Sequence, residues 1–210
     1  MGKRIGGIVI LAGGTAKRLG GVSKPDLDIA GRRLIDIVFD QLDAIGFTGQ
    51  RIVVAPADVD VPRGVQLTLE DPPHGGPLAG IGAGVQALDV DDDDLVAIAT
   101  CDAPVAVRLL PKMADVLSEL MGTGAEEPAV SNFDGVVPLN EDGWPQYTHG
   151  LYRAGALRSQ PFERDGSVRR ALGALHLATI LDEAGHCIDV DAPEDVPALI
   201  AHLARVENTG

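Results

Sequence analysis

Residues 7–24 have the sequence GIVILAGGTAKRLGGVSK, an apolar run that breaks into glycines and then into basic residues. The apolar part has the length and composition of a buried strand. Two adjacent glycines, Gly13 and Gly14, let the backbone that follows approach a ligand closely and direct its N–H groups toward it. Arg18 and Lys24 supply the positive charge that a polyphosphate requires. The segment therefore predicts a phosphate-binding loop at the end of a strand.

The spacing within this loop excludes two common phosphate-binding motifs. A Walker A loop has Gly-Lys-Ser/Thr after four spacer residues, and a dinucleotide-binding fingerprint has Gly-x-Gly-x-x-Gly. Neither pattern occurs between residues 7 and 24. The structural alternative is a glycine turn with solvated basic residues. Because Arg18 and Lys24 both lie inside the glycine-flanked stretch, we favour the phosphate-binding interpretation.

Apolar runs of strand length alternate with helical patterns along the chain. The expected strands are Gly7–Leu11, Arg51–Ala55, Gln66–Glu70, Leu95–Ala99, Pro128–Ser131 and Val136–Leu139. The expected helices are Leu34–Ile45, Leu78–Leu88, Val107–Leu120, Leu151–Leu157, Val168–Leu175 and Pro193–Arg205. Such alternation is typical of a mostly parallel sheet with helices on both faces. We therefore expect an α/β fold with a single three-layer α/β/α, Rossmann-like domain over residues 1–206 and a disordered tail over 207–210.

The composition limits the classes of partner. The net charge of −14 argues against nucleic acid, but residues 1–33 hold seven basic and two acidic residues, so a small polyanion can still be attracted there. Cys101 and Cys187, as the two cysteines, are too few for a disulfide framework or a structural zinc site and fit a reducing cytoplasm. No apolar run is long enough to cross a membrane. We expect a cytoplasmic protein with a small-molecule substrate.

Two acidic residues follow expected strands, at the edge of the sheet where ligands bind in such folds. Asp102 comes after a wholly apolar strand, and an ionised carboxylate there is costly without a cation or hydrogen-bond donors. Mg²⁺ takes one or two carboxylates together with substrate phosphates, so Asp102 is a candidate metal ligand. The alternative role is a cap on the helix that starts near Val105. Asp71 is the second residue, and Cys101 is expected to be a small half-buried residue rather than a nucleophile.

Residues 70–84, EDPPHGGPLAGIGAG, predict a rigid turn that opens a helix, with Pro77 in its first turn. Gly76, Gly80 and Gly84 leave one face of that helix without side chains, so a flat ligand can approach it. The alternative for this face is tight packing of the helix against the sheet.

Two further segments carry weaker signals. Trp144, Tyr147 and Tyr152 cluster in residues 143–153, either as a wall for a flat ligand or as a satellite of the core. Asp191 and Glu194 have capping-box spacing before an apolar helix, so Asp191 is expected above all to cap that helix.

The motifs together resemble one family. The pattern L-A-G-G-x-x-x-R-x-G-x-x-x-K of residues 11–24 resembles the signature loop of nucleotidyltransferases that use nucleoside triphosphates. Its G-G form and the G-P-L-A-G of residues 76–80 resemble the molybdenum cofactor guanylyltransferases, members of the MobA-like nucleotidyltransferases. The C-D-x-P of residues 101–104 is similar to that family's metal-binding motif. The resemblance runs from Ile8 to about Leu203.

The chain departs from the family pattern at a few positions. Ala55 stands where a polar residue, often Asn, is expected to contact the nucleotide. Pro25 stands where Gly is more usual, a combination that also resembles sugar-phosphate nucleotidyltransferases. Asp189 and Asp191 stand where many relatives have Asn. Two carboxylates at these positions repel an anionic pterin phosphate, so they disfavour direct contact with it. They could instead act as additional ligands to a metal ion.

The resemblance implies transfer of GMP from GTP to the phosphate of a molybdopterin-type cofactor, with release of pyrophosphate and with Mg²⁺ as the metal. It implies catalytic roles for Arg18, Lys24 and Asp102, with Asp102 as the metal ligand. The implied nucleotide-binding residues are Leu11, Ala12, Gly13, Gly14, Lys24, Asp71, Gly76, Pro77, Leu78, Ala79, Gly80 and Asp102. N–H groups from Ala12 to Thr15 would hold the phosphates, and Asp71 would accept hydrogen bonds from base or ribose. Gly21, Asp189 and Asp191 are implied near the acceptor, with Arg169 and Arg170 either on a pterin phosphate or solvated at a helix start.

Other functions stay open at this stage. One is a sister enzyme of the same fold that uses CTP or acts on a sugar phosphate. Another is a non-catalytic member that binds nucleotide or pterin, which the retention of Arg18, Lys24 and Asp102 disfavours. A nicotinamide oxidoreductase is disfavoured because its fingerprint is missing. The resemblance also allows transient contact with other cofactor-biosynthesis proteins or acceptor apoenzymes, and it leaves the oligomeric state undefined.

Overall fold

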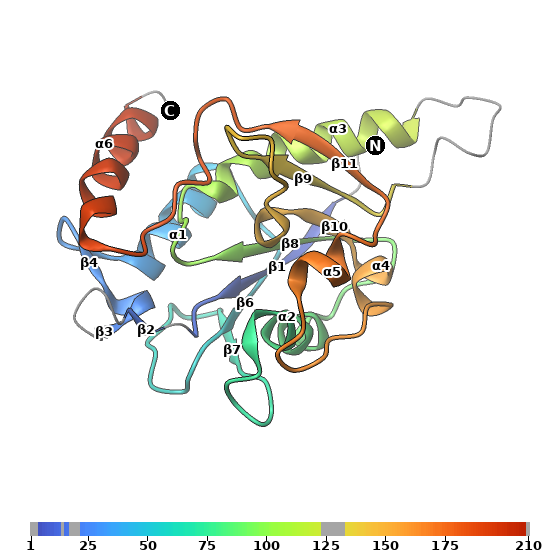
Figure 1. Ribbon diagram of the computed structural model, residues 1–210, viewed down its shortest axis with the longest axis horizontal. Helices are drawn as coiled ribbons and strands as arrows, with labels where there is room; N and C mark the ends of the chain where they lie inside the picture. Colours follow the sequence, from blue (N-terminus) through green and yellow to red (C-terminus); the bar gives the residue numbers. More distant parts are fainter. Residues whose placement is uncertain (1–3, 14, 17–21, 123–132, 209–210) are drawn as a thin grey trace.

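The computed structural model describes residues 4–13, 15–16, 22–122 and 133–208. A seven-stranded sheet lies at its centre with helices on both sides (Figure 1). In spatial order its strands are β11 (Leu177–Leu181), β9 (Gly135–Leu139), β10 (Leu151–Arg153), β8 (Leu95–Thr100), β1 (Ile5–Leu11), β6 (Gln50–Val54) and β7 (Gln66–Thr68). The helices are α1 (Leu34–Ala44), α2 (Gly76–Ala87), α3 (Leu110–Gly122), α4 (Ala154–Arg158), α5 (Val168–Leu172) and α6 (Val196–Glu207).

Shorter elements connect these layers. Two hairpins lie outside the main sheet: β2 (Thr15–Ala16) pairs with β3 (Val22–Ser23), and β4 (Asp28–Ile29) pairs with β5 (Arg32–Arg33). Short 3₁₀ helices cover Lys24–Asp26, Ala106–Leu109, Tyr147–His149 and Pro193–Asp195. No helix in the described ranges is both long and apolar enough to cross a membrane.

The pairing confirms the predicted mostly parallel α/β sheet. β1 runs parallel to both β6 and β8, and Leu11 pairs with Val54 on one side and with Thr100 on the other. The carboxyl ends of the three central strands therefore meet at one edge of the sheet. β10 runs antiparallel to β8 and β9, while β11 runs parallel to β9. The edge formed by β1, β6 and β8 positions the candidate site.

The side chains of the central strands alternate between two apolar layers. Ile8 and Ile10 are fully buried in a cluster with residues of α1 and α3, whereas Val9 is buried in a second cluster with residues of α2 and α4. Each such side chain contributes about 1.5–3 kcal/mol by leaving water. A third cluster holds α6 against α1, with Leu199 and Leu203 among its buried residues. The three-layer arrangement expected from the alternation of strands and helices is confirmed.

Several predicted boundaries were wrong. The expected helix Leu151–Leu157 is a strand followed by a short helix, because Leu151 and Tyr152 pair with β8 and β9 before α4 begins. The strand Leu177–Leu181 was not predicted; it completes the sheet beside β9. The helix expected over Val168–Leu175 ends at Leu172. The expected strand Pro128–Ser131 lies outside the described residues.

The end of the chain also differs from the expected tail over 207–210. Helix α6 continues through Glu207, whose carboxylate accepts hydrogen bonds from Arg32 Nη2 at 3.0 Å and Gln41 Nε2 at 3.3 Å. Asn208 Nδ2 donates to Ala204 O at 2.6 Å. Glu207 therefore contacts the rest of the domain, and Asn208 caps α6, while residues 209–210 of the expected tail lie outside the described residues.

Candidate active site

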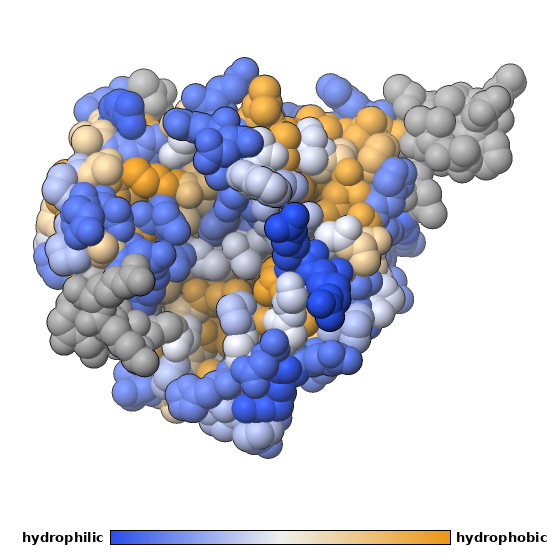
Figure 2. All heavy atoms as spheres, in the orientation of Figure 1, coloured by the Kyte–Doolittle hydropathy of each residue, from blue (hydrophilic) through white to orange (hydrophobic). Residues whose placement is uncertain are grey.

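A cavity of about 520 Å³ opens at the carboxyl edge of the central strands. Its floor includes Leu11 at the end of β1, Val54 at the end of β6 and Thr100 at the end of β8. Figure 2 shows a hollow with apolar atoms on its floor over the region where β1 ends in Figure 1. The sheet edge and the start of α2 together therefore enclose a space large enough for a nucleotide-sized ligand.

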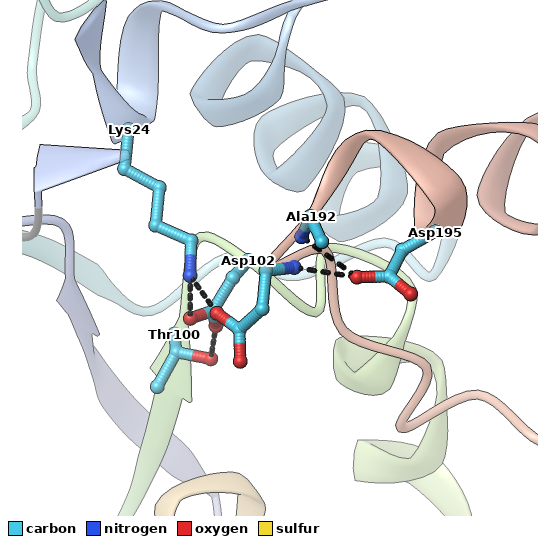
Figure 3. Close-up of polar contacts among 6 residues, drawn as sticks. Lys24, Thr100, Asp102, Ala192 and Asp195 are labelled. Atoms are coloured by element: carbon cyan, nitrogen blue, oxygen red, sulfur yellow. Dashed lines mark hydrogen bonds and ion pairs between the residues drawn. The ribbon is translucent and has the colours of Figure 1, made fainter. Parts of the chain in front are cut away.

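Lys24 lies at one end of this cavity, between two carboxylates. Its Nζ donates to Asp102 Oδ2 at 2.8 Å and to Asp191 Oδ1 at 2.6 Å. Asp102 Oδ1 also accepts a hydrogen bond from the hydroxyl of Thr100 (Figure 3). The Lys24 side chain is 12% exposed. The alternative that Lys24 is a solvated basic residue on a glycine turn is therefore wrong. Arg18, Gly14 and Gly21 lie outside the described residues.

The pKa values of this pair show that both groups stay charged. Burial by itself would raise the pKa of Asp102, but the hydrogen bonds from Lys24 and Thr100 and the positive charge of Lys24 together hold that pKa below its ordinary value. Burial likewise opposes the charged form of Lys24, yet the hydrogen bonds to Asp102 and Asp191 raise its pKa above 10.5. The result is a partly desolvated ion pair at the mouth of a cavity.

The structure corrects the expected role of Asp191. The carboxylate that caps the turn before α6 belongs to Asp195, whose Oδ2 accepts from the N–H groups of Asp191 at 3.0 Å and Ala192 at 2.8 Å (Figure 3). The carboxylate of Asp191 is turned to Lys24 instead. Burial, and then repulsion by Asp191 and Asp102, raises the pKa of Asp189. Three carboxylates thus converge near one ammonium group.

This donor set fits a divalent cation of the hard class. Carboxylate oxygens are the ligands that Mg²⁺ prefers, and Mg²⁺ binds through one or two of them together with substrate phosphates and water. Within the described ranges no group of three or more His, Cys, Asp or Glu side chains is arranged to hold a metal ion by itself. A metal at Asp102 would therefore depend on oxygen atoms brought by the substrate.

The expected glycine face of α2 has two different roles. Gly80 lines the cavity, and a Cβ built on it would lie 3.4 Å from Leu11 Cδ2 and from Val54 Cγ1. A Cβ on Gly84 would lie 2.2 Å from Val9 Cγ1, so this residue permits tight packing of α2 on the sheet. Gly76 begins α2 with a φ of +81°, a conformation that favours glycine, and it lines the cavity with Pro77. One part of the face therefore lines the cavity, and the other allows α2 to pack closely on the sheet.

Other predicted nucleotide contacts lie beside the cavity. Gly13 is among its lining residues, but Ala12, Leu78 and Ala79 are buried and are not. The N–H of Ala12 donates to Val54 O at 2.9 Å, so the expectation that this particular N–H holds a phosphate was wrong. Asp71 is exposed, and its neighbour Glu70 lines the cavity in its place.

Some cavity residues were not among the predicted site residues. Glu70, Thr148 and Asp165 line the space, although Thr148 and Asp165 come from segments far from the glycine loop. Glu70 Oε1 accepts from Gly75 N at 3.0 Å and so holds the turn before α2. The expected strand Gln66–Glu70 placed Asp71 at the edge of the sheet, but β7 ends at Thr68, and the side chain that lines the cavity there is that of Glu70.

The aromatic cluster divides between core and surface. Tyr152 is fully buried, and its hydroxyl donates to Tyr147 O at 2.6 Å, as the core alternative predicts. Trp144 is 56% exposed, and the guanidinium of Arg169 lies 5.3 Å from the centre of its ring system. Cys101 is 2% exposed rather than half-buried, and burial raises its pKa far above its ordinary value. Such a thiol is a poor nucleophile, as expected.

The seven-stranded sheet, with helices on both faces and a charged cavity at the carboxyl ends of its central strands, defines a domain of the α/β class whose fold is shared by solved enzymes. The solved structures of similar fold include molybdopterin-guanine dinucleotide biosynthesis protein A from Archaeoglobus fulgidus, at a TM-score of 0.63 and 15% identity over 95% of this chain and 99% of that chain. They also include 4-diphosphocytidyl-2C-methyl-D-erythritol synthase from Anaerococcus prevotii, at a TM-score of 0.65 and 15% identity over 98% of this chain and 100% of that chain.

The sequence narrows this class to one family. Residues 8–180 match the MobA-like NTP transferase domain, and the chain belongs to that family. It is 32% identical over 140 residues to a molybdenum cofactor guanylyltransferase from Rhodopseudomonas palustris. The matched region spans 59% of this chain and 64% of that relative.

Proposed function

We propose that this protein transfers GMP from GTP to the terminal phosphate of a molybdopterin-type acceptor and releases pyrophosphate. The observation that carries the proposal is a single cavity that joins the Lys24–Asp102 pair to the G-P-L-A-G start of α2. One end of this space suits a polyphosphate and the other a planar base. The family membership and the guanylyltransferase relative support the choice of substrates.

In the proposed reaction, an oxygen of the acceptor phosphate attacks the α-phosphorus of GTP in line with the departing group. A new P–O bond forms to the acceptor, the bond between the α-phosphorus and the bridging oxygen breaks, and pyrophosphate leaves with that bond's electron pair. No covalent enzyme intermediate is needed, because positioning and charge neutralisation supply most of the catalysis. Lys24 turns from its carboxylates toward the phosphates and balances their charge, and Arg18 has the same proposed role.

A divalent ion is part of this proposal, because the carboxylates beside Lys24 provide oxygen ligands of the kind that Mg²⁺ prefers. Asp102 would hold Mg²⁺, with Asp191 or Asp189 as the second carboxylate. When bound, the ion neutralises phosphate charge as the α–β bond breaks. Displacing Lys24 from Asp102 would free both the carboxylate for the metal and the ammonium for the nucleotide, so the observed ion pair fits the nucleotide-free state.

We divide the remaining residues between the nucleotide and the acceptor. We assign Gly13, Gly14, Gly76, Pro77 and Gly80 to the nucleotide, with Leu11, Ala12, Leu78 and Ala79 forming its immediate support. Gly21, Asp189 and Asp191 are assigned to the acceptor side. We also propose that residues 1–206 function as one domain, in the cytoplasm, with transient contact to other proteins of cofactor biosynthesis.

A cytidylyltransferase is the second candidate, because the Anaerococcus synthase has the same fold at a similar TM-score. The two functions separate in one experiment. GTP, CTP and ATP are each combined with molybdopterin or with a sugar phosphate, and pyrophosphate release is measured for every pair. We expect turnover with GTP and molybdopterin, and a higher kcat/KM for GTP than for CTP. A preference for CTP would overturn the guanylyltransferase assignment.

A further inference from the structure

Residues 162–166, between α4 and α5, pack across the turn that precedes α2. The guanidinium of Arg164 donates from Nη1 to Pro72 O and from Nη2 to Pro73 O, the second bond at 3.2 Å. The N–H of Asp165 donates to Gly75 O at 2.7 Å. The turn over 72–76 therefore has its carbonyl groups held by a segment that lies about 90 positions away in the sequence.

Close packing fixes this segment in place. A Cβ built on Gly82 would lie 2.5 Å from Phe162 Cβ, and one built on Gly166 would lie 2.7 Å from Leu78 Cδ2. Asp165 has a φ of +54°, in the left-handed region that Asp and Asn tolerate better than other side chains. The missing side chain of Gly76 leaves room next to Asp165. A Cβ built on Gly76 would lie 3.9 Å from Asp165 Oδ1. The carboxylate of Asp165 is thereby held at the wall of the cavity.

The charges that line the cavity give it two unlike ends. Among the described lining residues Lys24 is the one Lys or Arg side chain, and it lies with Asp102 at the edge of the sheet. Glu70 and Asp165 line the part beside the start of α2. The lining charges of Lys24 and Asp102 balance at the first end, whereas Glu70 and Asp165 leave the second end with a net negative charge. A triphosphate is therefore repelled less at the edge of the sheet, and the base of a bound nucleotide is directed toward Glu70 and Asp165. Leu11 and Val54 provide apolar surface between the two ends.

The two carboxylates at the base end differ in their partners. Glu70 Oε1 already accepts a hydrogen bond from Gly75 N at 3.0 Å. The carboxylate of Asp165 has no hydrogen-bond or ion-pair partner within the part of the chain that the structure describes. It can therefore accept hydrogen bonds from a ligand without breaking a contact. Guanine presents two adjacent donors, N1–H and the N2 amino group, that match the two oxygens of a carboxylate.

We infer that Asp165 is a specificity-determining residue that accepts hydrogen bonds from the guanine base, and that Arg164 is the positioning residue that fixes the base-side turn. This inference rests on the proposed use of GTP and adds a residue that lies outside the family motifs. Carboxylate acceptors that pair with N–H donors give discrimination that pocket shape alone does not, because a base without those donors leaves the hydrogen bonds unmade.

The test compares GTP with inosine triphosphate, which lacks the N2 amino group. Affinities of both nucleotides are measured by titration calorimetry for the wild type, for Asp165→Asn and for the matched control Glu163→Gln. Asn tolerates the backbone conformation at position 165. Glu163 is, like Asp165, an exposed carboxylate of the same segment, but it does not line the cavity. We expect the wild type and Glu163→Gln to bind GTP about tenfold or more tightly than inosine triphosphate.

In Asp165→Asn the ratio of the two affinities should fall to within about threefold, mainly through weaker binding of GTP. An unchanged ratio in this variant, or an equal fall in Glu163→Gln, would overturn the inference. The calorimetric result is independent of transfer chemistry. A wild type that released no pyrophosphate from GTP with molybdopterin would therefore refute the proposed function, while a collapsed ratio in Asp165→Asn would still support the role of Asp165.

Arg164→Lys tests the positioning role separately. Lysine keeps the positive charge but lacks the planar fork that reaches two carbonyl oxygens. We expect the KM for GTP to rise about tenfold with kcat within about twofold of the wild type, and the ratio of affinities for GTP and inosine triphosphate to decrease in parallel. A loss of kcat at unchanged KM would contradict a positioning role.

Discussion

Lys24 and Asp102 are 78 positions apart in the sequence, and their Nζ and Oδ2 atoms lie 2.8 Å apart in the fold. The contact joins the loop after the first strand to the end of the strand beside it. Their side chains are 12% and 26% exposed, so neither charge is fully hydrated. Changing either residue leaves the other partly desolvated and without its partner. Variants of this pair can therefore show whether each residue contributes to the rate of the reaction, to the stability of the fold, or to both.

Asp102→Asn should lower kcat by about 10²-fold or more, because the amide neither binds a divalent ion well nor balances Lys24. Lys24 retains Asp191 as a partner, so circular dichroism should show an unchanged fold. Pyrophosphate release at saturating GTP and Mg²⁺ measures the loss. Asp142→Asn, in an exposed turn, is the control. Wild-type turnover in Asp102→Asn would remove Asp102 from the catalytic site.

Lys24→Met should reduce both stability and activity. Two carboxylates lose their shared cation, and we expect a loss of about 1–3 kcal/mol in the free energy of unfolding, measured with urea. The double variant Lys24→Met/Asp191→Asn removes one of the repelling charges and should recover part of that loss. Its kcat should stay about 10²-fold below the wild type, since the phosphates still lack the ammonium group. Recovery of activity together with stability would mark Lys24 as purely structural.

Gly80→Ala and Gly84→Ala should have opposite effects, although both lie on α2. A methyl group at position 84 collides with Val9, and overpacking of this kind costs about 1–3 kcal/mol. At position 80 the nearest atoms are at 3.4 Å, so stability should be kept or should rise through helix propensity by up to about 1 kcal/mol. The methyl group there enters the cavity and should raise the KM for GTP. Thermal unfolding and steady-state kinetics distinguish the two outcomes.

His149 should make the protein less stable in mild acid. Its pKa is lowered to about 4, mainly by burial, and its Nδ1 has no hydrogen-bond partner among the described residues. The folded state keeps this ring neutral down to about pH 4, whereas the unfolded chain protonates it below its ordinary pKa of 6.5. Unfolding therefore takes up a proton between these values, and stability falls as the pH decreases, by on the order of 3 kcal/mol in total.

The matching variant for this effect is His149→Leu, which removes the titrating group. Urea unfolding at pH 7, 5.5 and 4 should show a smaller acid-induced loss of stability in the variant than in the wild type. Parallel losses in the two proteins would show that other groups cause the acid sensitivity.

Asp71→Ala tests the residue that follows the expected strand Gln66–Glu70 and that the structure leaves exposed. Asp71 was expected to accept hydrogen bonds from the base or the ribose, and because Glu70 rather than Asp71 lines the cavity, the variant is used to test the ribose. The variant should bind GTP about tenfold more weakly and should lose most of the preference for GTP over 2′-deoxy-GTP. Unchanged affinity for both nucleotides would show that this carboxylate does not reach the ligand.

The parts of the site that could be predicted from sequence are those built by local pattern. The run Leu95–Ala99 is apolar throughout, which indicates a strand covered on both faces, and the polar residue that ends it must lie at the sheet edge. Pro77 after adjacent glycines likewise marks the start of a helix. These features place Asp102 and the start of α2 beside the glycine loop without any knowledge of long-range contacts.

The parts that could not be predicted depend on contacts between distant segments. Asp191 and Asp195 are both acidic and flank the same turn, so their spacing does not show which of them caps it. In the fold, Asp191 forms an ion pair with Lys24, and Asp195 caps the turn. The segment that begins at Leu151 has a helical pattern, but pairing with β8 and β9 outweighs that local preference. Arg164 and Asp165 meet the turn before α2 only through the tertiary fold.

The salt bridge between Lys24 and Asp191 spans 167 positions of the chain. At a synthesis rate of about 5–20 residues per second, the nascent polypeptide carries Lys24 for roughly 10–30 s before Asp191 is added. During elongation the ammonium group can pair with Asp102 alone, once β8 has been made. The complete charge cluster therefore assembles only after residue 191 has been added, and a ribosome-stalled chain that ends before residue 191 cannot form it.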